Sequence, residues 1–80
     1  MLHKFTFRVP TETVDEATVI EVRVSPGEIV KMDQIVLVIE TAKAAMELPS
    51  DVQGVVREVL VKEGDLLKVG QALFLYEPTN

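Results

Sequence analysis

The chain contains no cysteine and no tryptophan, and its single histidine is His3. Without cysteine it can form no disulfide framework, thiolate nucleophile or cysteine zinc site. One histidine is too few for a histidine-based metal cluster, and no serine–histidine–aspartate set is indicated around it. We therefore expect neither catalytic nor metal-ligating residues, and any redox chemistry has to be supplied by a bound cofactor.

The chain also lacks a concentrated run of lysine and arginine, and its formal net charge is -5. Nucleic-acid affinity depends largely on clustered cationic side chains, so we expect no nucleic-acid partner. Residues 1–8 lack the long apolar run of a signal peptide or a membrane span. We expect no membrane partner and a cytoplasmic location, or the mitochondrial matrix if the source is eukaryotic.

The 80 residues are 48% hydrophobic, which predicts one domain over residues 1–80 with a single small core. Valine, isoleucine and phenylalanine alternate with polar residues, and no stretch shows sustained helical periodicity. The polar segment 11–16 follows Pro10 and reads as a solvated loop rather than a carboxylate metal site. The predicted strands cover residues 4–8, 18–24, 35–39, 54–61 and 72–77.

An internal repeat relates the two halves of the chain through a shift of 37 positions, which takes Gly27 to Gly64. Identical residues coincide at Val19/Val56, Glu21/Glu58, Val22/Val59, Val24/Val61, Gly27/Gly64, Lys31/Lys68, Gln34/Gln71 and Glu40/Glu77. Each copy reads as strand, glycine turn and strand. We predict an all-β flattened barrel or sandwich, with two small antiparallel sheets and an internal pseudo-twofold repeat.

One lysine, Lys43, lies among small residues where the two halves join. The segment 41–47 is composed of good helix formers, but it is short and is stopped by Pro49. The flanking strands should therefore dominate and place Lys43 at the tip of a tight hairpin. Ala42 and Ala44 on either side would leave the amine accessible to another enzyme.

The sequence resembles the lipoyl domains of 2-oxo acid dehydrogenase complexes, along with the related biotinyl carrier domains and the glycine-cleavage H protein. The lipoyl pattern is matched by Glu40-Thr41-Ala42-Lys43-Ala44 and Glu47-Leu48-Pro49, except that Ala42 replaces the family's aspartate. Further matching segments are Pro26-Gly27-Glu28, Gly54-Val55-Val56 and Val61-Lys62-Glu63-Gly64-Asp65. Biotin carriers usually have methionine on both sides of the modified lysine, so the flanking alanines favour lipoate.

The resemblance implies that a lipoate ligase or lipoyl transferase attaches lipoate to Lys43, within the attachment hairpin formed by Glu40, Thr41, Ala42 and Ala44. The domain would then be a non-catalytic, monomeric swinging-arm carrier of acyl groups and reducing equivalents. Its implied partners are the thiamin-dependent dehydrogenase, acyltransferase and dihydrolipoyl dehydrogenase components of a complex. Two alternatives stay open, namely a biotin carrier of a carboxylase and an unmodified β-sandwich interaction module.

Overall fold

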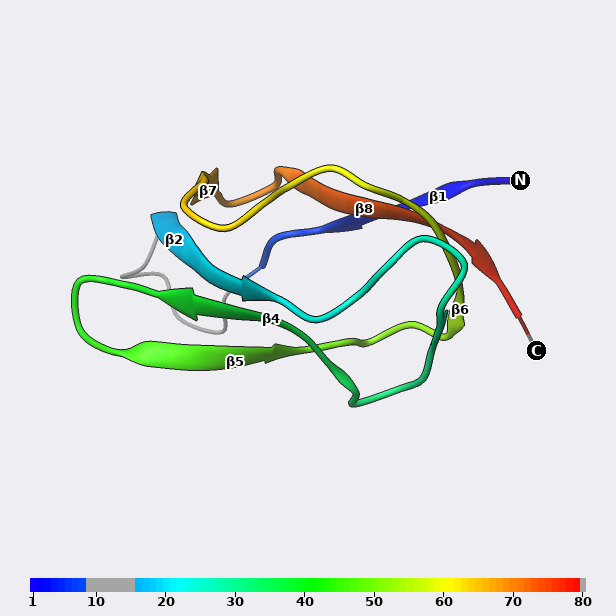
Figure 1. The fold of residues 1–80 in the computed structure, drawn as a ribbon, viewed down its shortest axis with the longest axis horizontal. Coiled ribbons are helices and arrows are strands. Elements are labelled where there is room, and N and C mark those ends of the chain that lie inside the picture. The colour runs from blue at the N-terminus through cyan, green and yellow to red at the C-terminus, as the bar shows by residue number, and fades with distance from the viewer. Residues whose placement is uncertain (9–15, 80) are drawn as a thin grey trace.

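The computed structural model describes residues 1–8 and 16–79, which form two four-stranded antiparallel sheets. Sheet A has the strand order β1 (His3–Thr6), β8 (Ala72–Pro78), β6 (Gly54–Val59) and β3 (Ile29–Val30). Sheet B has the order β5 (Ala45–Pro49), β4 (Ile35–Glu40), β2 (Glu16–Val22) and β7 (Leu66–Lys68). Figure 1 shows the two layers, and the predicted all-β sandwich is confirmed.

The strand order carries the pseudo-twofold repeat. The shift of 37 positions relates β2 to β6, β3 to β7 and β4 to β8. The order β8-β6-β3 in sheet A therefore corresponds strand by strand to the order β4-β2-β7 in sheet B. Each half contributes its short strand to the sheet of the other half, because β3 pairs with β6 and β7 pairs with β2. Neither half can therefore complete a sheet alone.

The repeat extends to individual hydrogen bonds at the turns that precede β3 and β7. The Gly27 N–H donates to the Val56 carbonyl at 2.7 Å, and the Gly64 N–H donates to the Val19 carbonyl at 2.8 Å. Both glycines have positive φ, +91° and +92°, a conformation that L side chains rarely adopt. The coincident glycines of the sequence thus mark two equivalent crossings between the halves.

The core lies between the inward faces of the two sheets, where alternate strand residues meet. Phe5 stacks on Phe74 with ring centroids 4.6 Å apart. The fully buried hydrophobic side chains are Phe7, Val19, Val30, Val36, Leu37, Ile39, Val56, Leu67, Leu73 and Phe74. No helix of the described residues is long and apolar enough to span a membrane.

Some predicted boundaries were wrong. β1 ends at Thr6 instead of continuing to residue 8, because the Phe7 N–H and carbonyl bond to Gln71 and Gly70 after a register shift. Glu16, predicted as the end of a loop, begins β2 because it pairs with Lys68. The rest of that predicted loop, residues 11–15, lies outside the described residues.

Gly54 has a packing role that the sequence did not indicate. It lies on β6 opposite Pro78, and a Cβ added there would come within 2.4 Å of the Glu77 carbonyl oxygen and 3.0 Å of Tyr76 Cδ2. A backbone oxygen cannot move aside as a flexible side chain would. Gly54 therefore permits the close approach of β6 to β8.

We predict that Gly54→Ala lowers the free energy of unfolding by about 3 kcal/mol or more, as overpacking against backbone does. Gly64→Ala is the matched control: the space around Gly64 is open, and its φ of +92° alone should cost about 1–2 kcal/mol. Urea unfolding of both variants measures the difference. A Gly54→Ala variant as stable as the Gly64→Ala variant would contradict the proposed clash.

Candidate functional site

The candidate site is the hairpin that joins β4 to β5 at one end of sheet B. Its strands pair through Ile39 with Met46 and Glu40 with Ala45, so the chain reverses over residues 41–44. Figure 1 shows this hairpin at the left end of the long axis, with both chain ends at the right. The predicted hairpin is therefore present, and the helix-forming composition of residues 41–47 is overridden by pairing of β5 with β4.

Thr41 holds the turn through four local hydrogen bonds. Its N–H donates to the Ala44 carbonyl at 2.9 Å, and its hydroxyl donates to the same carbonyl at 3.1 Å. The hydroxyl oxygen accepts from the N–H groups of Lys43, at 3.2 Å, and Ala44, at 3.3 Å. A threonine hydroxyl that bonds nearby backbone groups is a recognised way of stabilising a turn. The backbone on both sides of the lysine is thus tied to one side chain.

The turn places Lys43 in solvent. Lys43 and its neighbours Ala42, Ala44 and Ala45 are all exposed, whereas Thr41 is half-buried beneath them. None of the ion pairs among the described residues involves Lys43. The site therefore offers one accessible amine with alanine methyl groups beside it, which suits covalent attachment by an external enzyme.

All five residues predicted for the hairpin lie together, since Glu40 is the last residue of β4 and residues 41, 42, 43 and 44 form the turn. The sequence places Thr41 in the hairpin, but the hydrogen bonds of its hydroxyl were not predicted. A threonine at the first position of a four-residue turn, three residues before Ala44, is a known turn-stabilising residue and could have indicated them. Metal ligation finds no support at residues 1–8 and 16–79, where no suitable group of histidine, aspartate and glutamate side chains occurs.

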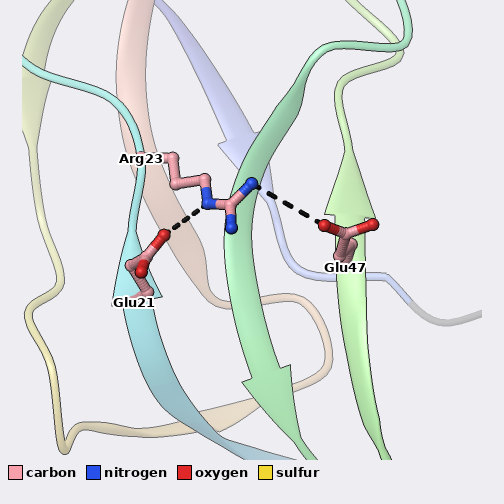
Figure 2. Close-up of polar contacts among 3 residues, drawn as sticks. All are labelled: Glu21, Arg23 and Glu47. Atoms are coloured by element: carbon pink, nitrogen blue, oxygen red, sulfur yellow. Dashed lines mark hydrogen bonds and ion pairs between the residues drawn. The ribbon is translucent and has the colours of Figure 1, made fainter.

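A group of three charged side chains lies on the outer face of sheet B, where it extends across β4 to β5. This group was not predicted from the sequence. Arg23 bonds Glu21 through Nε, and its Nη1 lies 3.7 Å from a Glu47 carboxylate oxygen on β5 (Figure 2). The hydrogen bond to Glu21, and the charge of that residue, raise the pKa of the Arg23 guanidinium. The three side chains are about half exposed, so this group contributes little to stability.

Comparison with known proteins finds a family model, described as "Biotin-requiring enzyme" and named for biotin and lipoyl, that matches residues 4–75. The dihydrolipoyllysine-residue acetyltransferase component of the pyruvate dehydrogenase complex of Azotobacter vinelandii is 45% identical over 71 residues, covering 89% of this chain and 11% of the relative. The corresponding protein of Pseudomonas aeruginosa is 44% identical over 70 residues, covering 88% of this chain and 13% of the relative. The chain thus spans about a tenth of the length of these curated relatives.

Two further matches bear on the attached group. The biotin carboxyl carrier protein of acetyl-CoA carboxylase of Porphyra purpurea is 43% identical over 54 residues, covering 68% of this chain and 34% of the relative. Among solved structures, the lipoyl domain of the 2-oxoglutarate dehydrogenase complex of Azotobacter vinelandii superposes with a TM-score of 0.67 and is 34% identical. That superposition covers 92% of this chain and 98% of the other.

We predict that Thr41→Val, which removes the hydroxyl but keeps the shape of the side chain, loosens the turn and costs about 1 kcal/mol. The Lys43 and Ala44 N–H groups lose their acceptor, so their amide hydrogen exchange should accelerate while exchange in β4 stays slow. Thr41→Ser keeps the hydroxyl and should restore protection. Unchanged exchange of both amides in Thr41→Val would show that the hydroxyl does not hold the turn.

Proposed function

Because the chain belongs to the family of biotin- and lipoyl-bearing domains, whose model covers residues 4–75, we propose that it is a carrier domain with lipoate attached to Lys43. The observation that carries the proposal is the exposed lysine at the centre of a two-stranded hairpin, flanked by exposed alanines and held by Thr41. The domain is not itself an enzyme. Its role is to present and confine a covalently bound group.

Lys43 supplies the amine nitrogen that forms an amide bond with the carboxyl carbon of a lipoyl group activated at the expense of ATP. The bond from that carbon to its leaving group breaks, and the lysine ammonium gives up two protons in all together with its positive charge. The bound lipoyl group supplies a disulfide that can carry acyl groups and electrons. Thr41 and the β4–β5 pairing keep the base of the side chain fixed. Tethering then replaces free diffusion with a high local concentration of the carried group.

Lipoate is favoured over biotin by the residues beside the lysine and by the extent of the matches. Ala42 and Ala44 stand where biotin carriers usually have methionine. The acetyltransferase relatives cover 88–89% of the chain, compared with 68% for the biotin carrier protein. The solved lipoyl domain covers 92%. Biotin on Lys43, in a carboxylase, is the second candidate because that carrier is 43% identical over its matched segment.

The proposed partners follow from the names of the relatives, which are components of the pyruvate and 2-oxoglutarate dehydrogenase complexes. A lipoate ligase or lipoyl transferase would modify Lys43, and thiamin-dependent dehydrogenase, acyltransferase and dihydrolipoyl dehydrogenase components would use the arm. We further propose that residues 1–80 form one monomeric carrier domain that works in the cytoplasm. Ala42 bears on which complex recognises it, because the family pattern has aspartate at that position.

We predict that Lys43→Arg folds like the unsubstituted protein but accepts no lipoyl group, because the guanidinium cannot form the amide. The measurement is intact mass after incubation with lipoate, ATP and a purified lipoate ligase. Lys31→Arg, which changes another exposed lysine, is the control and should gain one lipoyl increment. A lipoyl increment on Lys43→Arg would refute the assignment of the attachment site.

A further inference from the structure

The pseudo-twofold repeat allows the outer faces of the two sheets to be compared position by position. In sheet B, a row of side chains runs across the strands through Leu66, Thr18 and Glu40. The equivalent row in sheet A runs through Ile29, Val55 and Glu77. Each row thus has an exposed aliphatic residue on its short strand, β7 or β3, and a glutamate on β4 or β8. A residue that differs between the two rows can therefore indicate a function that only one sheet has.

The main difference between the two sheets is the residue at the register shift, which interrupts β6 in sheet A and β2 in sheet B just after the row. In sheet A this position is Arg57, whose Nε donates to Glu77 Oε1 at 3.0 Å. That hydrogen bond and the charge of Arg57 lower the pKa of the Glu77 carboxyl. In sheet B the equivalent position is Ile20, and no ion pair between described residues involves Glu40. Glu77 therefore has a cationic partner within the domain, whereas the position equivalent to that partner in sheet B is occupied by Ile20.

Of Glu40 and Glu77, the glutamate that forms no ion pair with another described residue is Glu40, at the end of β4 where the lysine hairpin begins. Glu40 pairs with Ala45 and directly precedes the Thr41 turn. Glu77 is the penultimate residue of β8, the strand that runs toward the C-terminus at the opposite end of the molecule (Figure 1). Ile20 is 43% exposed and Leu66 is 55% exposed, although both are large aliphatic residues. We call Ile20, Glu40 and Leu66 the sheet B patch. It combines apolar surface with a carboxylate on the face from which the hairpin extends.

We propose that the sheet B patch is the docking surface for the enzyme that attaches the group to Lys43, an inference that rests on the proposed function. An enzyme that acts on the Lys43 amine has to cover the hairpin, and the outer face of sheet B is continuous with it through β4 and β5. The complementary surface has apolar side chains against Ile20 and Leu66 and a cationic side chain against Glu40. Residues of this kind make apolar contact at the centre of an interface and fix its orientation by charge.

The repeat also supplies the variants that test this surface. Ile20→Arg places an arginine on sheet B at the position equivalent to Arg57. The new arginine should form an ion pair with the Glu40 carboxylate, as Arg57 does with Glu77, and leave the fold as stable as before. Leu66→Ser removes an exposed aliphatic residue, and Ile29→Ser removes its equivalent on sheet A, where Ile29 is 59% exposed. Rates of lipoyl attachment by a purified lipoate ligase, followed by intact mass, give KM and kcat for each protein.

We expect Ile20→Arg and Leu66→Ser each to raise KM about fivefold to tenfold with kcat unchanged, as loss of a docking contact does. Ile29→Ser should stay within about twofold of the unsubstituted protein, because it lies outside the docking surface. Equal KM values for all four proteins, or an equal rise in Ile29→Ser and Leu66→Ser, would overturn the docking surface and leave the carrier assignment standing. Failure of the unsubstituted protein to accept the group would overturn both.

Discussion

The pairing of β3 with β6 and of β7 with β2 is the constraint on which the rest of this structure depends. Each short strand completes the sheet of the other half, so the two sheets and their shared core form together. Gly27 and Gly64 make the crossings possible through positive φ values and equivalent hydrogen bonds. A small domain without disulfides thereby gains a frame in which β4 and β5 are held by neighbours.

The lysine hairpin takes its properties from that frame. β4 is an interior strand of sheet B in which three of six residues are buried and two more are half-buried, while β5 is the edge strand that returns from the turn. The Thr41 hydroxyl then accepts from the Lys43 and Ala44 N–H groups and donates to the Ala44 carbonyl, which ties the turn to the end of β4. A rigid base with an exposed amine is what a carrier needs, because the attached arm does the moving while its origin stays in place.

Much of this organisation could be predicted from sequence. Alternating valine and isoleucine gave the strands, and the 37-position repeat gave the two sheets and the position of the hairpin. The exchange of short strands could not be predicted, because periodicity does not say which strands pair over long separations. Asp33 is a second example: it adopts φ 68° where its equivalent, Gly70, has φ 93°, and its N–H donates to the Ser50 carbonyl. The contacts of Arg23 with Glu47 and of Gly54 with β8 likewise join segments far apart in the sequence, so no local pattern indicates them.

Attachment of lipoate to Lys43 in the native protein is the proposal on which the carrier function depends. Its most direct test is tandem mass spectrometry of peptides from the protein purified from a lipoate-sufficient source. We expect a lipoyl increment on the peptide that contains Lys43, localised to that residue, and none on the other lysines. A biotinyl increment at Lys43, a lipoyl increment on a different lysine, or an unmodified Lys43 in all molecules would contradict it.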